Sequence, residues 1–249
     1  MTPKRMIFLA AGIFAAVGIL ASITIIAING GFSGGGPSIF NPPTSKDLWT
    51  IGGNIDNGMN LTYSLTTVGG KSNLKDSTIS MTFHDTANKW KIDFRIQNGS
   101  AATKEISANF SKAQLLRTDS IPPQNDVFIQ PIESSIMAVR DLAKDPRYLV
   151  VGAVWDKIFT GSSTKDVKIE STASVSTPAG SFDIYSLEYK VGNSISKIYL
   201  NKDLPLPVMA QVYDDNDKIL YNYELQKYQS EQVDKLPQSA AIAFSTSNR

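Results

Sequence analysis

The sequence of 249 residues contains no cysteine and a single histidine, His84. The lack of cysteine excludes disulfides, thiol nucleophiles, iron–sulfur clusters and thiolate zinc sites. The sequence has no excess of basic charge either, because it contains 24 Lys and Arg and 23 Asp and Glu. Nucleic-acid binding needs a basic field, so we expect no nucleic-acid partner. We also expect no catalytic residues, no cofactor and no resident metal.

Charge is missing altogether from residues 6–28, an apolar run of 23 residues that follows Lys4 and Arg5. A helix of this length crosses the hydrocarbon core of a bilayer. Signal-peptide apolar regions are shorter and end at a small-x-small cleavage site, which residues 28–31 match poorly. We therefore favour an uncleaved signal anchor over a cleaved signal peptide. Gly12 and Ala16 form a small-xxx-small pair suited to packing against a second helix.

The positive-inside rule orients this anchor, because Lys4 and Arg5 are the only charges beside its N-terminal end. The chain then divides into a cytoplasmic stub (1–5), a transmembrane anchor (6–28), a Gly/Ser/Pro linker (29–47), an extracytoplasmic β domain (48–230) and a flexible tail (231–249). Without Lys4 and Arg5, 22 basic residues face 23 acidic ones. Charge therefore does not predict adhesion to anionic lipid. In the tail, residues 240–244 are an alternative candidate for docking on a sheet edge.

From residue 48 onward, apolar and polar residues alternate with a period of two. Trp90, Ile92, Phe94 and Ile96 are one example of such a dry face. This pattern is typical of antiparallel strands with one buried and one wet face. We predict a mainly β fold of about ten strands that form a curved antiparallel sheet, either a half-barrel or a sandwich.

One or two inserted helices interrupt the strands. Pro131 is expected to open a helix over residues 131–144, with Ile132, Ile136 and Val139 on its apolar face. A curved sheet needs such an element to fill its concave side. Residues 147–159 fit either a second helix or a buried strand, and periodicity does not decide between them.

Several short motifs follow one another near the C-terminal end of the domain. They are the stretch 177–185, which begins Thr-Pro-Ala-Gly-Ser-Phe, then Lys-Ile-Tyr-Leu-Asn at 197–201, Leu-Pro-Leu-Pro-Val at 204–208 and Tyr-Asn-Tyr-Glu-Leu at 221–225. Their order resembles bacterial envelope proteins built on a lipoprotein-carrier-like half-barrel, over residues 165–228. The resemblance implies an open sheet around helices, with a hydrophobic cavity for an acyl chain or a partner's side chain. The overall layout also resembles uncharacterised single-pass surface proteins of ammonia-oxidising archaea.

Tyrosines gather in the last strands, and they are the best candidates for a ligand or partner cavity under the inserted helix. The candidate cavity residues are Tyr185, Tyr189, Tyr221, Tyr223, Ile136 and Val139. The alternative for the tyrosines is ordinary cross-strand packing in the core.

Other polar motifs have plainer interpretations. The sequons at Asn60, Asn98 and Asn109 are candidate glycosylation sites on a domain outside the membrane. His84 is expected on a wet strand face, and no G-x-S-x-G elbow accompanies it. The run of acidic and amide residues at 214–217 is expected to be a hairpin turn, with a calcium site as the alternative.

These features predict a membrane-tethered, non-enzymatic module that holds a hydrophobic ligand or a partner protein outside the membrane. The alternative is an accessory subunit of a larger membrane complex, packed through Gly12 and Ala16. An extracytoplasmic hydrolase is the third and least favoured reading. The bilayer, through the N-terminal helix, and a lipid or protein partner are the expected binding partners.

Overall fold

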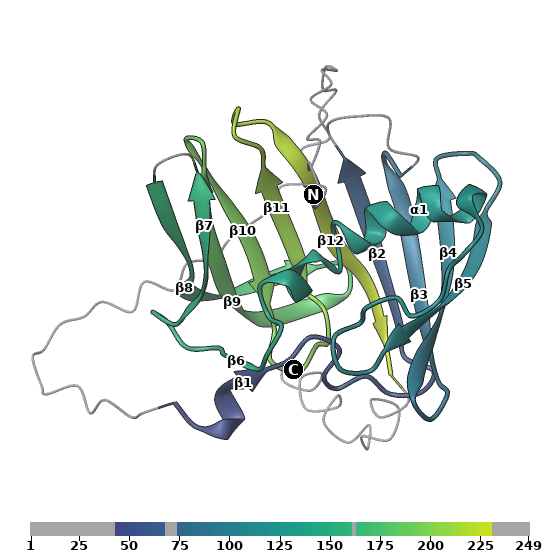
Figure 1. The fold of residues 1–249 in the computed structure, drawn as a ribbon, viewed down its shortest axis with the longest axis horizontal. Helices are drawn as coiled ribbons and strands as arrows, with labels where there is room; N and C mark the ends of the chain where they lie inside the picture. Colours follow the sequence, from purple (N-terminus) through teal and green to yellow (C-terminus); the bar gives the residue numbers. More distant parts are fainter. Residues whose placement is uncertain (1–42, 68–73, 161–162, 231–249) are drawn as a thin grey trace, which may run out of the picture.

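The computed structural model describes residues 43–67, 74–160 and 163–230. This part of the chain is mainly β (Figure 1). Its strands are β1 (Leu48–Trp49), β2 (Asn60–Thr67), β3 (Ser77–Asp85), β4 (Lys89–Asn98), β5 (Lys104–Ser111), β6 (Arg147–Tyr148), β7 (Val154–Thr160), β8 (Ser163–Thr177), β9 (Gly180–Val191), β10 (Ser194–Leu200), β11 (Met209–Tyr213) and β12 (Ile219–Gln229). One α-helix, α1 (Pro123–Glu133), and two 3-10 helices, η1 (Ser45–Asp47) and η2 (Ala138–Asp141), complete it.

Ten of these strands form a single antiparallel sheet in the order β5-β4-β3-β2-β12-β11-β10-β9-β8-β7. The last strand, β12, lies beside the first long strand, β2, so two meanders join in the middle of the sheet. The sheet curves and stays open, because β5 and β7 are its two edges. The predicted curved antiparallel sheet is therefore confirmed, and of the two arrangements left open, a half-barrel or a sandwich, the single open sheet agrees with the half-barrel. β1 and β6 form a separate two-stranded ribbon.

The period of two places the apolar residues on the concave face as expected. In β3 and β4, Ile79 lies opposite Ile96, Met81 opposite Phe94, and Phe83 opposite Ile92. All six side chains are at most 2% exposed. Opposite residues on neighbouring strands have their Cβ atoms about 5 Å apart, so these pairs stack into a continuous apolar layer.

The segment between β5 and β7 crosses the concave face, because it must connect the two opposite edges of the sheet (Figure 1). Its helix differs from the prediction. α1 begins at Pro123, with Pro122 at its N-cap, and Pro131 lies inside the helix, two residues before its end. A proline has no backbone N–H and ends helices early, so the chain turns after Glu133 and continues as η2.

The apolar positions of the predicted helix are nevertheless buried. Ile132, Ile136, Val139 and Ala143 are at most 1% exposed, although only Ile132 is in the α-helix. Their spacing was correctly interpreted as a core-facing stripe and wrongly as one continuous α-helix.

The predicted second helix over residues 147–159 is wrong. The chain forms β6, a turn at residues 150–153 and the edge strand β7. The strand alternative was closer, but β7 is not buried throughout: Trp155 is 2% exposed and Phe159 is 77% exposed. β7 is an edge strand and has a neighbouring strand on one side only, so few of its side chains pack into the core.

A buried ionic cluster holds the crossing segment to the end of β5. Glu133, 10% exposed, lies 3.3 Å from Nη2 of Arg117 and 3.5 Å from Nη1 of Arg140. The same Nη1 of Arg140 donates a 2.8 Å hydrogen bond to the carbonyl of Leu115. Arg117 also pairs with Asp126, so two guanidinium groups and two carboxylates balance at the junction of three segments.

The predicted anchor, with Gly12 and Ala16, most of the linker, and the tail all lie outside the described residues. Within the described ranges, no helix has both the length and the apolar character needed to cross a bilayer.

Candidate functional site

The predicted tyrosine cavity is occupied by the protein's own side chains. Tyr63 and Tyr223 pack edge to face with ring centroids 5.8 Å apart, and Tyr221 stacks on Tyr223 at 6.0 Å. The Tyr63 hydroxyl donates to the carbonyl of Pro207 at 2.9 Å. Burial raises the pKa of Tyr189 to about 12, and it also raises the pKa values of Tyr221 and Tyr223. Cross-strand core packing, the alternative interpretation, therefore describes these tyrosines.

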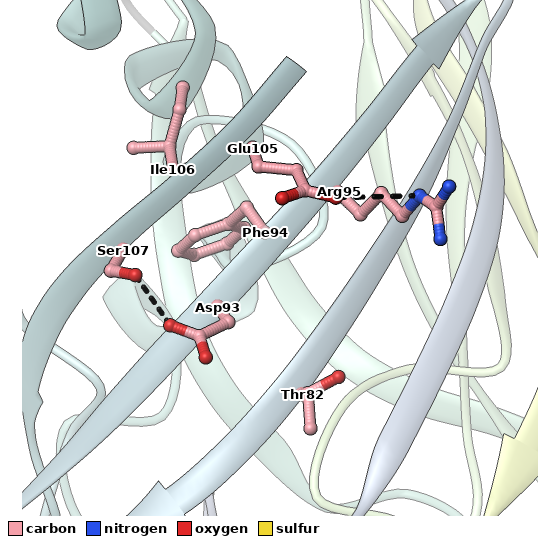
Figure 2. Close-up of a pocket in the computed structure, with 7 residues that line it drawn as sticks. All are labelled: Thr82, Asp93, Phe94, Arg95, Glu105, Ile106 and Ser107. Atoms are coloured by element: carbon pink, nitrogen blue, oxygen red, sulfur yellow. Dashed lines mark hydrogen bonds and ion pairs between the residues drawn. The ribbon is translucent and has the colours of Figure 1, made fainter. Parts of the chain in front are cut away.

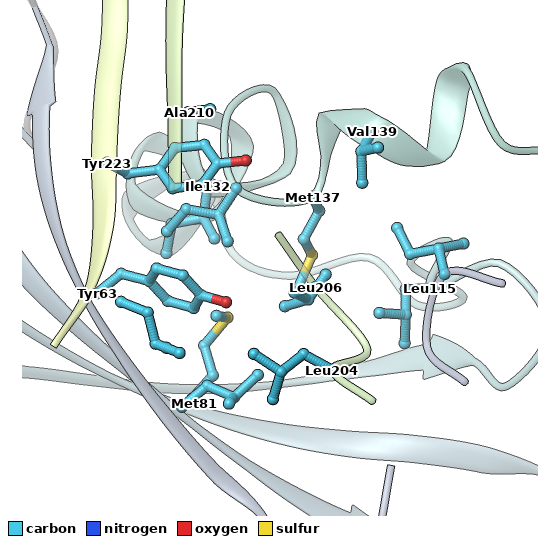
Figure 3. Close-up of a cluster of buried hydrophobic side chains, with 14 of the residues drawn as sticks. Tyr63, Met81, Leu115, Ile132, Met137, Val139, Leu204, Leu206, Ala210 and Tyr223 are labelled. Carbon is cyan, nitrogen blue, oxygen red and sulfur yellow. The ribbon is translucent and has the colours of Figure 1, made fainter. Parts of the chain in front are cut away.

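Residues from the crossing segment and from the loop before β11 fill the concave side above them (Figure 3). Ile132, Met137, Val139, Leu204 and Leu206 are at most 3% exposed. Ile136 and Val139, predicted to line a cavity, belong to this same core cluster. The concave face is thus a packed interior at the positions where a hydrophobic ligand was expected.

Tyr185 lies elsewhere, at a hollow of about 420 Å³ formed by the turn end of the β8–β9 hairpin, the loop after β10 and the end of β12. Its lining residues are Ser181, Phe182, Asp183, Tyr185, Asn201, Lys202, Asp203, Leu204 and Tyr228. The volume lies within the range of ligand-sized clefts. Aromatic side chains form its walls and charged ones its rim.

Asn201 fixes the geometry of this hollow, which we call the hairpin hollow. Its side chain is nearly buried, its Nδ2 donates to the carbonyl of Asp183 at 2.8 Å, and its Oδ1 accepts from the backbone N–H of Asp203 at 2.9 Å. Leu204 forms the floor, since its carbonyl accepts the indole N–H of the buried Trp49 at 3.0 Å. Two loops far apart in sequence are therefore held in a defined relation.

β-Bulges explain how this hollow forms. The pairing of β8 with β9 shifts register between Ile169 and Ser171, and the pairing of β12 with β2 shifts between Leu225 and Lys227. A bulge bends its strand and increases the local twist. Figure 1 shows β8 and β9 bending across the lower end of the sheet, where β8 also contacts β12.

Of the residues that line the hairpin hollow, the sequence interpretation named only Tyr185 as a cavity residue. The stretches 177–185, 197–201 and 204–208 contain Phe182, Asp183, Asn201 and Leu204, so the resemblance pointed to this region. It did not indicate that these residues line one hollow. Alternation alone places side chains on a face, but it does not show where a bulge brings two strand ends together.

A second hollow, of about 330 Å³, lies on the outer face of the sheet over β3, β4 and β5 (Figure 2). It is lined by Thr82, Asp93, Phe94, Arg95, Glu105, Ile106 and Ser107. Arg95 and Glu105 are 69% and 76% exposed, and their closest charged atoms are 3.9 Å apart. No polar or charged side chain that lines this shallow site is buried, so it lacks a fixed polar anchor for a ligand.

His84 lies beside this outer hollow, on the wet face as predicted. Its Nε2 is 3.0 Å from Oδ2 of Asp93, while the hydroxyl of Ser107 donates to Oδ1 of the same carboxylate. Burial alone would raise the pKa of Asp93, but Ser107 and Lys91 outweigh it and hold this pKa below its ordinary value. A serine hydrolase needs its hydroxyl on the imidazole, and here Ser107 is bonded to the carboxylate.

The asparagines of the three sequons are all half-buried. The Nδ2 of Asn60 donates to Ser80 and Thr82, and that of Asn109 donates to Asp119. Asn98 lies at the end of β4, where the chain turns. Glycosylation stays a prediction, and Asn98 is the sequon placed nearest to a turn.

The residues at 214–217 form the β11–β12 hairpin turn, as expected. Asp214 Oδ1 accepts the backbone N–H groups of Asn216 and Lys218, both at 2.9 Å. Asp217 reaches the neighbouring β9–β10 turn, where Oδ1 accepts from the backbone N–H of Asn193 at 2.6 Å and of Ser194 at 2.8 Å. In the described part of the chain, no three His, Asp or Glu side chains gather in a cluster suited to a metal ion.

Replacing Asp217 by alanine is expected to destabilise the domain at neutral pH and to lose this effect in acid. The N–H groups of Asn193 and then Ser194 hold the pKa of Asp217 below its ordinary value of 3.8. A lowered folded pKa stabilises the fold above the unfolded value, and the stabilisation disappears as the pH falls through the folded value. The midpoint difference between wild type and Asp217→Ala should therefore be constant above about pH 5 and shrink as the pH falls through 3.8 to the lower folded value. A difference independent of pH would contradict this.

No family model and no curated protein matches the sequence. Among solved structures, an exported protein with a YmcC-like fold from Bacteroides fragilis is 11% identical, with a TM-score of 0.34, and covers 74% of this chain and 100% of its own. MucB is 10% identical with a TM-score of 0.39, and covers 72% of this chain and 55% of its own. A chain of the MucA/MucB complex of Pseudomonas aeruginosa is 10% identical, with a TM-score of 0.37, and the match covers 70% of this chain and 54% of that chain.

This chain spans about half the length of the MucB chain. These identities and TM-scores assign neither a family nor a function to it. The resemblance to archaeal surface proteins finds no support among them.

Proposed function

We propose that the protein is a membrane-tethered, extracytoplasmic, non-enzymatic module that binds a partner protein in the hairpin hollow. The observation that carries this proposal is the hollow itself, where Phe182, Tyr185 and Tyr228 are half-buried beside the nearly buried Asn201. Aromatic side chains in a partly enclosed pocket are the usual anchors of protein interfaces. Asp183, Lys202 and Asp203 are exposed and supply a polar rim.

A protein partner fits this geometry better than a lipid. The concave face, where an acyl chain would lie in a carrier, is packed with the protein's own core. The hairpin hollow is open and has charged groups on its rim, and a polypeptide segment offers both apolar and charged side chains. The accessory-subunit reading remains compatible with such a site, since the partner is then another subunit of the complex.

The hollow also lies near the end of the domain where the chain enters and leaves. On the entry side, Trp49 lies four residues after the start of η1, and its indole N–H donates to the carbonyl of Leu204. On the exit side, Tyr228 lies two residues before Ser230, the last described residue. A module tethered through its N-terminal segment holds this hollow near the membrane. The proposed partner is therefore a segment of another protein close to the bilayer.

Replacing Phe182 by alanine is expected to weaken the complex at least tenfold, because an anchor side chain contributes more than about 1.4 kcal/mol to binding. Full-length protein is extracted in mild detergent, and native mass spectrometry compares the free and complexed protein. Phe159→Ala is the matched control, since it removes an exposed ring outside the hollow. Equal loss in both variants, or no loss in either, would contradict the proposed site. Thermal midpoints of both variants exclude unfolding as the cause.

A further inference from the structure

An exposed apolar surface lies where the chain enters the domain from its N-terminal segment. It consists of Leu48, Tyr148, Val151 and Val154, which are 38%, 43%, 59% and 48% exposed. Leu48 and Tyr148 are directly opposite in the β1–β6 ribbon, and the other two follow in the turn after β6 and at the start of β7. We call these four residues the entry patch.

The entry patch is held on a rigid base. Trp49 and Trp155, each 2% exposed, stack beneath it with ring centroids 5.7 Å apart. The indole N–H of Trp155 donates to the carbonyl of Tyr148 at 2.9 Å, and the backbone N–H of Leu149 donates to the carbonyl of Asp47 at 2.7 Å. The turn that carries Val151 is closed by a bond from the N–H of Ala153 to the carbonyl of Val150. The exposed side chains are therefore presented by ordered backbone and not by a loose loop.

We propose that the entry patch docks on the bilayer surface, with Val151 and Tyr148 entering the interfacial region. This inference rests on the proposed membrane tether. Only 19 residues (29–47) separate the predicted anchor from Leu48, and a chain of that length reaches at most about 65 Å even when fully extended. At such a distance the bilayer is present at a high effective concentration, and a weak apolar contact is enough for docking.

The residue types of the entry patch indicate which part of a bilayer it would contact. Valine, leucine and tyrosine at its centre suit the boundary between headgroups and acyl chains, where a tyrosine has both an apolar ring and a polar hydroxyl. The charged residues next to it in the sequence are mixed: Lys46, Lys144, Arg147 and Lys157 are accompanied by Asp47, Asp145 and Asp156. We therefore infer docking by apolar insertion into lipid, with little dependence on anionic headgroups or salt.

Docking in this way would orient the hairpin hollow. The loop of Leu204 is bonded to Trp49 directly beneath the patch. A domain docked through the entry patch would hold the hollow at a fixed distance from the bilayer. A partner segment that is also close to the membrane would then meet the hollow at a higher effective concentration.

The absence of cysteine makes a direct test simple. The full chain with Val151→Cys is labelled with an environment-sensitive fluorophore and reconstituted into phosphatidylcholine vesicles. Phe159→Cys is the control, because Phe159 is 77% exposed and lies five residues along β7 from Val154 of the patch, about 17 Å away from it. We expect a blue shift and quenching by spin-labelled lipid at position 151, and an aqueous, unquenched signal at position 159.

The signal at position 151 should change little when phosphatidylglycerol or salt is added. An aqueous signal at 151 equal to that at 159 would overturn the inference, and so would a shielded signal that lipid-borne quenchers do not reach, which indicates a second copy on the patch. Flotation of the vesicles reports separately on the tether. Protein that floats but shows an aqueous position 151 contradicts the docking alone, whereas protein that does not float contradicts the tether on which the docking rests.

Discussion

Replacing Tyr223 by alanine is expected to lower the free energy of unfolding by about 3–5 kcal/mol, the range for a fully buried aromatic side chain. Tyr223 is 2% exposed and lies between Tyr63 and Tyr221 in the middle of the sheet, at the β2–β12 junction. The large loss follows because the residue is surrounded by fixed neighbours, which cannot collapse into the space it leaves. Urea unfolding followed by tryptophan fluorescence measures the change.

Leu220→Ala is the control on the same strand, since Leu220 is 37% exposed and should change the free energy by less than about 1 kcal/mol. The comparison also bears on function. If Tyr223→Ala cost no more than Leu220→Ala, the concave face would be loosely packed, and an acyl-chain carrier would again be the better interpretation. A large difference supports a closed interior and a binding site outside it.

Replacing Glu133 by alanine is expected to cost about 3 kcal/mol, because it leaves the largely buried Arg140 without the carboxylate it contacts, while Arg117 keeps its ion pair with Asp126. Arg117 and Arg140 are 22% and 14% exposed in their side chains, and both contact Glu133. The cluster joins α1 and η2 to the segment after β5, so its loss should loosen the whole crossing segment. Urea unfolding again measures the change.

Glu105→Ala supplies the contrast, because the Glu105–Arg95 pair is exposed and such pairs contribute at most about 1 kcal/mol. Raising the salt concentration should leave the Glu133 effect almost unchanged, since buried pairs are screened much less. A cost for Glu133→Ala as small as that for Glu105→Ala would mean that water reaches the cluster and that the crossing segment is held by apolar contacts alone.

The strands were predictable because their burial follows a period of two. Ile92, Phe94 and Ile96 are buried as the alternation indicates, and Lys91 and Arg95 are exposed. The crossing segment was less predictable, because a proline is compatible both with the start of a helix and with a position near its end. Pro131 was assigned to the first role, while Pro123 has it.

The hairpin hollow was the least predictable feature. It depends on bulges near Glu170 and Gln226 and on the side chain of Asn201, and a single sequence contains no pattern for either. Of the residues predicted for a cavity, only Tyr185 lines this hollow, while Tyr223, Ile136 and Val139 belong to the core. Tertiary packing, not local pattern, determines which aromatic side chains remain accessible to a partner.

Site-specific photo-crosslinking in the cell membrane tests the proposed function most directly. A photoreactive residue replaces Lys202, exposed on the rim of the hairpin hollow, or Lys218, equally exposed at the β11–β12 turn. We predict a discrete adduct with a second protein from position 202 and none from position 218. Equal labelling at both positions, no protein adduct from position 202, or adducts with lipid alone would contradict partner binding at this hollow.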